Sequence, residues 1–495
     1  MYILKKKTGK ILKLAVVLLL IAALLCSCGS PGNTGADNGN QANANAAENS
    51  VNTGNEADND ANSSANSNEA GNTADTNSAD NTADSNTAEN TADTNSADNT
   101  ADSNTAENTA DTNSADNTAN TVPAPDNTAN NTNNAEPEKS WAEETLESLT
   151  LDEKIGQMFM IRPDQLQTSW DTWKQHSVDE GVEDFTEEMQ ANLQLYPVGG
   201  YILFDKHFVD PDQAKAFTAQ MYEFSKIVPF VGTDEEGGTK VSRIANAAWK
   251  GFEVPQVDGM GYIGETGETE LAFMAGDTIA KYLVDYGINL DFAPIADLDD
   301  IDSEGVIGDR SFGSDPQLTS KMISAFIDGL HGGNILSCLK HFPGQGSAEI
   351  DTHAAYSEIE KTWEEMLLDD IVPFAENKEK ADMIMLSHIS YPNVTGNELP
   401  TSLSSVLITD KLRNEIGYEG IIITDSFHMG AIINTYTSED AAVTAIKAGA
   451  DIVLMPDDLV KAFNAVKYAV ESGDISEERI NESVLRILNL KDKLR

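Results

Sequence analysis

Eight short apolar runs, each followed by a longer amphipathic stretch, constrain the fold of this chain more than any other sequence feature. Strands buried on both faces read as continuous apolar runs of about four to eight residues. Such runs lie at 158–161, 199–204, 228–233, 288–295, 335–340, 383–387, 420–424 and 451–455. Helical periodicity fills the stretches between them, for example at 266–286, 316–331, 360–377, 404–416, 437–448 and 458–472. The alternation predicts a single α/β domain at 140–495, folded as a closed, parallel (β/α)8 barrel of the TIM type.

An open, doubly wound sheet would show the same alternation of strands and helices. In that fold a G-x-G-x-x-G turn commonly follows the first strand and binds a dinucleotide. The residues after 161 contain no such turn. We therefore favour the closed barrel over the open sheet.

The first 28 residues predict a lipoprotein signal peptide. Lysines between positions 5 and 13 precede an apolar run at 14–25, which is short for a bilayer span. The run ends in L-C-S-C-G, and Cys28 with Ser27 before it fits the lipobox at which a cysteine is acylated. We expect a lipid on Cys28 to tether the chain to the extracellular face of a bacterial cell membrane. A plain cleaved signal or an uncleaved anchor is the alternative.

Residues 29–139 predict a disordered, low-complexity linker. Asn, Thr, Ala and Asp dominate it, and an 18-residue repeat begins at Asn72, again at Asn90 and in part at Asn108. The repeat contains no large apolar side chain, so stacked copies could not offset the entropy lost on ordering them. We interpret this segment as a flexible stalk between the anchor and the barrel.

The charge and the motifs of the chain indicate which partners and cofactors we do not expect. The formal net charge is −50, whereas phosphate binding needs a basic surface, so we expect no nucleic-acid partner. The acidic run at 297–302 lacks the glycine and terminal glutamate of an EF-hand loop, so we expect neither a metal nor another cofactor. Cys338 lies in an apolar run and is expected to be a buried thiol. We expect a monomer.

Charged and polar residues follow the candidate strands, where a (β/α)8 barrel carries its active site. The third strand leads into T-D-E-E-G-G-T-K-V-S-R at 233–243, and G-D-R-S-F-G at 308–313 follows the fourth. The fifth leads into K-H-F-P-G-Q-G-S-A-E-I-D-T-H at 340–353. S-H at 387–388 ends the sixth, and T-D-S-F-H-M at 424–429 follows the seventh. Their position at strand ends predicts an active site.

The residue types suit the cleavage of a glycosidic bond. This reaction needs a negative group beneath the anomeric carbon and a proton donor for the leaving oxygen. Asp425, at the end of a buried strand, suits the first role, either as a nucleophile or as a stabiliser of positive charge. His353 suits the second because an imidazole has an unperturbed pKa of about 6.5. Asp351, two residues earlier, would orient the imidazole.

Further polar residues of these segments are expected to hold the sugar. The candidates for binding its hydroxyls and an N-acetyl group are Asp234, Arg243, Arg310, Lys340 and His341. For His388 we favour a buried, supporting role over direct contact with the substrate. His428 and Met429 are expected mainly to pack against their neighbours.

Taken together, these motifs resemble glycoside hydrolase family 3, and within it the β-N-acetylglucosaminidase branch. LTLDEKIGQM, D-E-E-G-G, FAPIADLD, G-D-R-S-F-G, KHFPG, D-T-H and ITDSFHMGAI occur in the family's order across 141–495. The resemblance implies a retaining exo-β-N-acetylglucosaminidase acting on cell-wall muropeptides or chitin-type oligosaccharides. It implies Asp425 as nucleophile, His353 with Asp351 as acid/base pair, and the five sugar-holding residues as the glycone site. The family's two-domain glucosidases take the acid/base from a second domain, which we do not expect here.

Two departures from the family pattern affect the predicted site. Gln345 stands where the family usually has the second histidine of K-H-F-P-G-H-G. The segment after D-E-E-G-G reads T-K-V-S-R instead of R-V-x-R, and Arg243 is its best match. Three alternatives stay open: phosphorolysis, because a histidine acid/base does not repel phosphate; β-glucosidase or β-xylosidase activity; and a non-catalytic, glycan-binding surface lipoprotein.

Overall fold

Eight parallel strands form a closed barrel in the computed structural model, which describes residues 139–167, 182–303, 305–346 and 357–495. The strands are β1 (Phe159–Ile161), β2 (Gly200–Leu203), β3 (Phe230–Thr233), β4 (Leu290–Asp291), β5 (Leu336–Phe342), β7 (Met383–Leu386), β9 (Ile421–Thr424) and β10 (Val453–Leu454). They are ordered β10-β1-β2-β3-β4-β5-β7-β9. Backbone hydrogen bonds from Thr424 to Ile452 and from Phe427 to Leu454 join β9 to β10. The predicted (β/α)8 barrel is confirmed.

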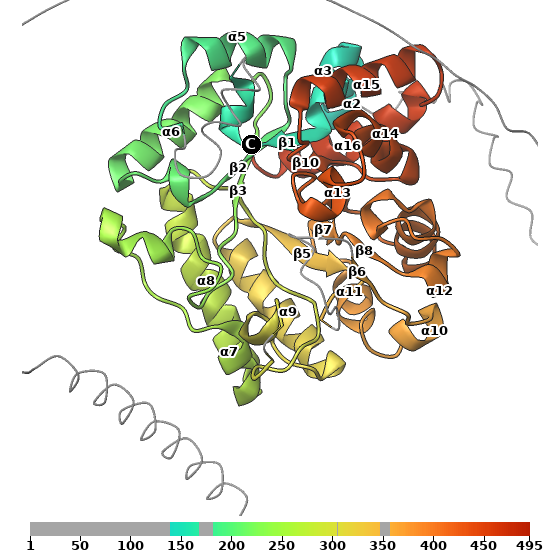
Figure 1. Cartoon of the computed structure of the whole chain (residues 1–495). Helices are drawn as coiled ribbons and strands as arrows, with labels where there is room; N and C mark the ends of the chain where they lie inside the picture. Colours follow the sequence, from blue (N-terminus) through green and yellow to red (C-terminus); the bar gives the residue numbers. More distant parts are fainter. Residues whose placement is uncertain (1–138, 168–181, 304, 347–356) are drawn as a thin grey trace, which may run out of the picture. The chain divides into compact units, whose positions relative to one another are not determined.

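Helices follow each strand and surround the barrel (Figure 1). Before and between the first strands are α2 (Trp141–Ser148), α3 (Leu151–Gln157), α5 (Glu187–Leu195), α6 (Pro211–Phe224), α7 (Met260–Thr266), α8 (Thr269–Asp285) and α9 (Pro316–Gly332). The later helices are α10 (Trp363–Met366), α11 (Val372–Asn377), α12 (Pro392–Thr395), the π-helix η6 (Val406–Ile416), α13 (Gly430–Ile433), α14 (Ser438–Ala448), α15 (Leu459–Glu471) and α16 (Glu477–Asp492). Short 3-10 turns are η1 (Pro163–Leu166), η2 (Asp205–His207), η3 (Ala245–Lys250), η4 (Gly308–Arg310) and η5 (Thr401–Leu403).

Local sequence signals explain where several of these elements begin. Thr150 caps α3 and forms a reciprocal capping box with Glu153, and Asp315 caps α9 directly before Pro316. Every residue of the barrel strands is buried. Parallel strands that are covered on both faces need such continuous apolar sequence, which is why their positions could be predicted.

Two predicted elements are shorter than expected because prolines interrupt them. The run at 288–295 pairs as β4 over Leu290–Asp291 and again through a single bridge at Ile295, since Pro294 has no N–H to donate. The predicted helix at 360–377 is wrong as one element. It divides into α10 and α11, with Pro373 in the first turn of α11, where proline is tolerated.

A small two-stranded parallel ladder was not predicted from the sequence. It pairs β6 (Ser357–Glu358) with β8 (Ile389–Ser390), beyond the ends of β5 and β7. Cys338 is buried in β5, as expected of a core thiol. Within the described ranges, no helix has the length and apolar character needed to cross a membrane.

Candidate active site

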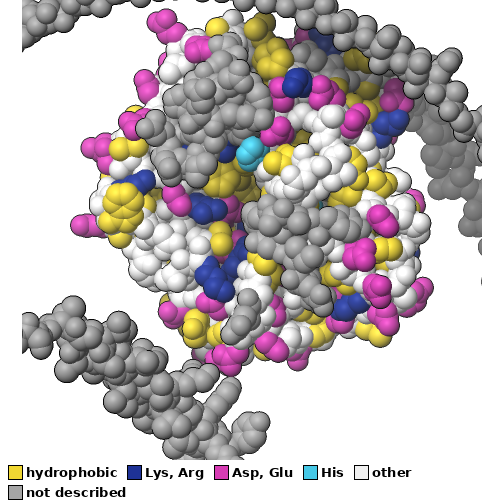
Figure 2. Space-filling view, in the orientation of Figure 1, with side chains coloured by type: hydrophobic (Ala, Val, Ile, Leu, Met, Phe, Trp, Pro, Cys, Tyr) yellow, Lys and Arg dark blue, Asp and Glu magenta, His cyan; other side chains and the backbone are white. Residues whose placement is uncertain are grey.

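A pocket of about 310 Å³ opens where the strands end, on the side at which the sequence predicted the active site. This volume is at the lower end of the range of about 300–1,000 Å³ typical of ligand pockets. The polar lining residues are Asp234, Glu236, Arg243, Arg310, Lys340, His341, Asp425, Ser426 and His428. The apolar ones are Ile202, Phe204, Val241, Met385, Met429, Leu454 and Met455. Figure 2 shows basic side chains and a histidine near the middle of the visible face.

A buried ion-pair cluster forms one wall of this pocket. Lys340, near the end of β5, lies 2.8 Å from Asp234 Oδ1 and 2.7 Å from Glu236 Oε1. The guanidinium of Arg310 donates two hydrogen bonds to Glu236, of 2.7 and 2.8 Å. Burial would lower the pKa of Lys340, but the two carboxylates outweigh it and raise this pKa. Burial would raise the pKa of Glu236, but Arg310 and Lys340 hold it well below its usual range. All members of the cluster therefore stay charged at neutral pH.

Arg243 lies on the rim of the same wall. Its Nη2 is 3.4 Å from Asp234 Oδ2, and its guanidinium lies over the ring of Phe204 at 5.3 Å. The turn that carries Arg243 is held by Glu235, whose carboxylate accepts the backbone N–H groups of Ile244 and Ala245 at 2.9 Å. This turn brings the arginine back to Asp234, in the pocket that the other predicted sugar-holding residues line.

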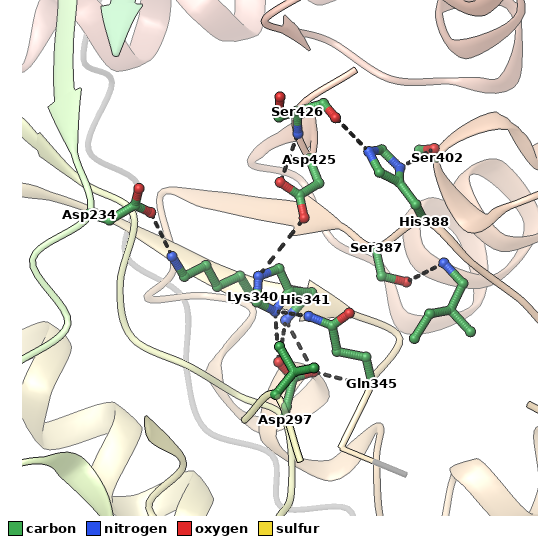
Figure 3. Close-up of polar contacts among 12 residues, drawn as sticks. Asp234, Asp297, Lys340, His341, Gln345, Ser387, His388, Ser402, Asp425 and Ser426 are labelled. Atoms are coloured by element: carbon green, nitrogen blue, oxygen red, sulfur yellow. Dashed lines mark hydrogen bonds and ion pairs between the residues drawn. The ribbon is translucent and has the colours of Figure 1, made fainter. Parts of the chain in front are cut away.

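His341 and Asp425 face each other across the floor of the pocket (Figure 3). His341 Nδ1 lies 2.7 Å from Asp297 Oδ2, and a carboxylate only accepts hydrogen bonds, so Nδ1 carries the proton. Its Nε2 then faces Asp425, at 4.0 Å from Oδ2. Asp297 also accepts the backbone N–H of Gln345 at 2.8 Å. The side-chain amide of Gln345 lies 2.7 Å from His341 Nδ1, and with Nδ1 protonated this contact is a hydrogen bond when the amide oxygen faces the ring. Gln345 thus helps to hold the ring of His341 in place.

Asp425 follows β9 and is fixed by its backbone. Its N–H donates to Leu386 O at 3.0 Å, and its Oδ1 accepts the N–H of Ser426 at 2.7 Å. The other oxygen, Oδ2, is directed to the pocket and to His341, as Figure 3 shows. A carboxylate with one oxygen held and the other presented to a pocket has the geometry of a nucleophile or of an electrostatic stabiliser.

His388 supports this floor without lining the pocket. It is fully buried, with Nδ1 at 2.9 Å from Ser402 Oγ and Nε2 at 2.9 Å from the backbone oxygen of Ser426 (Figure 3). The backbone oxygen belongs to the residue that holds Asp425 Oδ1. The structure therefore agrees with the supporting role that we favoured for His388.

Several residues of the site were missed or misjudged from the sequence. Glu236 and Asp297 had been seen only as parts of a motif and of an acidic run. Their roles depend on partners far along the chain, since Glu236 binds Arg310 and Asp297 binds His341. His428 and Met429 were expected mainly to pack, yet both line the pocket. The position of His428 at a strand end was a signal that could have been weighed more heavily.

The predicted site residues divide into those that the structure describes and those that it does not. Asp425 and the five predicted sugar-holding residues all line one pocket. Asp351 and His353 lie outside the described residues, as do Cys28, the signal peptide and the linker up to residue 138. Among the described residues, no group of three or more His, Cys, Asp or Glu side chains is arranged to hold a metal ion.

Comparison with known proteins decides the family. The model of the "Glycosyl hydrolase family 3 N terminal domain" matches residues 150–490. The chain belongs to glycoside hydrolase family 3. Both the family and the barrel domain agree with the resemblance read from the motifs.

Relatives that this chain resembles include proteins named beta-hexosaminidase. Beta-hexosaminidase A of Pseudoalteromonas piscicida is 30% identical over 335 residues, which are 62% of this chain and 55% of that protein. Beta-hexosaminidase of Hydrogenovibrio crunogenus is 33% identical over 291 residues, which are 57% of this chain and 79% of that protein. This family 3 chain thus matches little more than half the length of the first relative.

Solved structures give the same relationship. A glycoside hydrolase family 3 beta-N-acetylglucosaminidase from Paenibacillus sp. str. FPU-7 superposes with a TM-score of 0.62 at 31% identity. The match covers 70% of this chain and 62% of that one. A family 3 glycosyl hydrolase from Mycobacterium smegmatis has a TM-score of 0.60 at 25% identity, over 70% of this chain and 98% of that one.

Proposed function

We propose that this chain is a retaining exo-β-N-acetylglucosaminidase with Asp425 as its nucleophile. The observation that carries the proposal is the pocket itself. One oxygen of Asp425 is directed into it, opposite a wall of charged groups that hydrogen-bond to one another and face the same space. The names of the relatives, beta-hexosaminidase and beta-N-acetylglucosaminidase, support the choice of sugar.

The ion-pair cluster supplies the groups that would hold the sugar. Arg310, Lys340 and Arg243 offer N–H donors, and Asp234 offers lone pairs that are not all used by its cations. Because Glu236 fixes both Arg310 and Lys340, their donors are positioned before the sugar enters. Binding then needs little reorganisation, which is how preorganised groups favour a transition state.

The reaction proceeds in two displacements. First, the imidazolium of His353 gives its proton to the leaving oxygen while the bond from that oxygen to C1 breaks. Asp425 Oδ2 forms a bond to C1, which produces a covalent glycosyl-enzyme. Second, neutral His353 takes a proton from water, the water oxygen attacks C1, and Asp425 leaves as a carboxylate. Asp351 orients the imidazole throughout. His341 Nε2, 4.0 Å from Asp425, adds polar contact beside the reacting oxygen.

The proposed substrates are terminal β-linked N-acetylglucosamine residues of cell-wall muropeptides or chitin-type oligosaccharides. We also propose that a lipid on Cys28 holds the enzyme at the extracellular face of the bacterial membrane, with 29–139 as a stalk. The signal-peptide pattern and the repeat composition support this location. We propose a monomer, because a barrel of this kind has its active-site elements within one chain.

The function is tested by the release of 4-nitrophenol from the N-acetyl-β-D-glucosaminide, the β-glucoside and the β-xyloside by the full-length chain. We expect strong preference for the first and equal rates with and without phosphate. Asp425→Asn should abolish turnover, and His353→Ala should lower kcat by about 10²- to 10⁴-fold. Preference for the β-glucoside or the β-xyloside would indicate a β-glucosidase or β-xylosidase instead. A dependence on phosphate would indicate a phosphorylase, and no turnover of any substrate would indicate a binding protein.

A further inference from the structure

A buried tyrosine is hydrogen-bonded to the turn between His341 and Gln345. Tyr391 follows β8, and its side chain is completely buried. Its hydroxyl donates a hydrogen bond to the backbone oxygen of Gly344, which lies 47 residues earlier in the chain. Tyr391 does not line the pocket, and the proposed mechanism gives it no role. The purpose of this buried polar contact is therefore still to be explained.

The backbone around Tyr391 is anchored on both sides. Before it, β8 pairs with β6, and the backbone oxygen of Ile389 accepts the hydroxyl of Thr401 at 2.8 Å. After it, the N–H groups of Val394 and Thr395 donate to the backbone oxygen of Tyr391 at 2.9 and 3.0 Å. The tyrosine hydroxyl is thus presented from a fixed position.

The turn that receives this hydrogen bond has a restricted backbone. Gly344 has a φ of +119°, which favours glycine, and a Cβ at this position would lie 3.0 Å from Cβ of Asp370. The N–H of Gly344 donates to the backbone oxygen of His341 at 2.8 Å. The turn is thus held from within by its own hydrogen bond and from outside by the hydroxyl of Tyr391.

The surroundings of the Tyr391 hydroxyl keep it a hydrogen-bond donor. Burial, with a further contribution from the acidic side chains of Asp370 and Asp297, raises the pKa of Tyr391 well above its ordinary value. A phenol that keeps its proton can donate at every pH at which the enzyme would be assayed. The hydrogen bond to Gly344 is thus available throughout that range.

Gly344 is joined to the floor of the pocket by two hydrogen-bonded paths. One is the bond from its own N–H to the backbone oxygen of His341. In the other, the N–H of Gln345 donates to Asp297 Oδ1 at 2.8 Å, and Asp297 Oδ2 lies 2.7 Å from His341 Nδ1. His341 Nε2 in turn lies 4.0 Å from Asp425 Oδ2 (Figure 3). A shift of Gly344 is therefore transmitted to the imidazole beside Asp425.

We propose that Tyr391 is a positioning residue for the reaction, whose hydroxyl holds the turn at Gly344 so that His341 stays in place beside Asp425. This inference deepens the proposed function and rests on it. Tyr391 acts through His341 and does not itself touch the sugar. Without the hydroxyl, the Gly344 oxygen loses this donor, and a buried carbonyl group that lacks a partner shifts toward another donor or toward water.

The test compares the effect of one substitution in two backgrounds. Tyr391→Phe is introduced into the full-length wild type and into His341→Ala, and each enzyme is assayed with 4-nitrophenyl N-acetyl-β-D-glucosaminide. A misplacement of about 1 Å can cost about 10²-fold in rate, so a smaller shift should lower kcat/KM of the wild type by about 5- to 20-fold. In His341→Ala the same substitution should cost less than about 2-fold, because the residue that it acts through is absent. Equal factors in both backgrounds would overturn the positioning role.

The structure offers a matched control at the opposite end of the barrel. Tyr418, shortly before β9, is also completely buried, and its hydroxyl donates to the backbone oxygens of Ala381 and Ile421 at 3.1 and 3.3 Å. Tyr418→Phe should lower the melting temperature about as much as Tyr391→Phe, since each loses a hydrogen bond to a backbone oxygen. It should keep the wild-type kinetics, and an equal loss of activity in both variants would overturn the proposal. If Tyr391→Phe does not fold, Tyr391→Met replaces it.

Proton NMR of the resting enzyme separates this inference from the proposed function. The Nδ1–H of His341, which donates to buried Asp297, should give a downfield signal that is assigned by its loss in His341→Ala. The signal should shift in Tyr391→Phe and keep its position in Tyr418→Phe. If the wild type does not hydrolyse the sugar but the signal shifts as expected, the function fails while the positioning of His341 stands. An unshifted signal in Tyr391→Phe would overturn the positioning role even in an active enzyme.

Discussion

At the scale of single residues, Glu236 explains how two cations can lie side by side in the pocket. Its carboxylate is 2% exposed and accepts from Arg310 and Lys340 at 2.7–2.8 Å. Breaking a buried charge pair by removing one partner is strongly unfavourable, because it leaves the other charge uncompensated. The position of both donors therefore depends on a residue that need not touch the sugar.

We expect Glu236→Gln to lower kcat/KM by about 10- to 100-fold, since displacements on the order of 1 Å cost that much in an active site. The amide keeps the shape but places a donor against Arg310 or Lys340. Steady-state kinetics with the N-acetylglucosaminide measures the effect. Glu253→Gln, an exposed position that follows the same strand, is the control. Equal kinetics in the two variants would contradict the role of Glu236.

The residues that could be predicted from sequence are those in short motifs at strand ends. Asp234, Lys340, His341 and Asp425 could be chosen because each directly follows or ends an apolar run. Glu236 and Asp297 could not, because their importance lies in partners that only the closed barrel brings near. The separation between Glu236 and Arg310 is 74 residues, and that between Asp297 and His341 is 44.

At the scale of elements, the segment directly after β5 leaves no room for a side chain at Gly346. A Cβ on Gly346 would lie 1.8 Å from the backbone oxygen of Leu298, so the residue must be glycine or the backbone must move. Asp351 and His353 follow only a few residues later in the sequence. The backbone at Gly346 is thus held against Leu298, next to Asp297, which accepts the N–H of Gln345 at 2.8 Å.

Gly346→Ala should therefore lower kcat by about tenfold or more, because moving Gly346 away from Leu298 disturbs Gln345 and Asp297, which hold His341. Gly332→Ala is the control, since nothing lies within 4 Å of its added Cβ. Turnover and melting temperature are measured for both. Equal turnover in both variants would show that the segment tolerates the displacement.

Another element, α16, buries a lysine beneath the barrel. Lys491 Nζ donates to Gln157 Oε1 and Gly199 O, both at 2.7 Å, and lies 4.8 Å from the centre of the Phe230 ring. Burial lowers the pKa of Lys491 from 10.5 to about 7. Between these pH values the unfolded chain holds the proton and the folded chain does not. Above pH 10.5 the lysine is neutral in both the folded and the unfolded chain. As the pH falls toward 7, only the unfolded chain binds the proton, so the free energy of unfolding decreases.

Lys491→Met should remove this pH dependence. The free energy of unfolding of the wild type, compared with that of the variant, should rise with pH by up to about 1.4 kcal/mol per pH unit between the two pKa values. Urea unfolding from pH 6.5 to 10.5 measures the difference. Lys321→Met, at an exposed position of α9, should keep the wild-type slope. A slope in Lys491→Met equal to that of the wild type would contradict the lowered pKa.

The barrel strands could be predicted because each is long or apolar enough to leave a pattern. The strands β6 and β8 leave none because, unlike the equally short β4 and β10, they do not lie in a longer apolar run. The break between α10 and α11 could have been read from Pro373, because proline disrupts a helix interior. Sequence thus predicts elements best where a whole run of residues is buried. It predicts them least well where a single residue sets the boundary of an element.

At the scale of the whole molecule, the segments of the chain differ in composition and in what they can form. The barrel buries a continuous core, whereas the repeat before it has no large apolar residues with which to form one. A formal net charge of −50 favours solubility over association with anionic polymers. The anchor and the stalk stay predictions, because they rest on composition and on the lipobox alone.

Cys28→Ser should release the enzyme from the membrane without changing its kinetics on a small substrate. The reason is that the lipid would supply membrane affinity, while the pocket lies in the barrel. Labelling of cells with an alkyne fatty acid and fractionation of membranes measure both consequences. Cys338→Ser, at the buried thiol in β5, should keep the label. A labelled Cys28→Ser chain would contradict acylation at Cys28.

The central claim, a covalent intermediate on Asp425 formed with N-acetylglucosamine, is tested most directly by trapping it. The full-length enzyme is treated with 5-fluoro-N-acetyl-β-D-glucosaminyl fluoride, which slows the second displacement, and its peptides are mapped by mass spectrometry. We predict one labelled peptide, with the sugar on Asp425, and no label in Asp425→Asn. A label on another residue, or none in an enzyme that turns the fluoride over, would contradict the account.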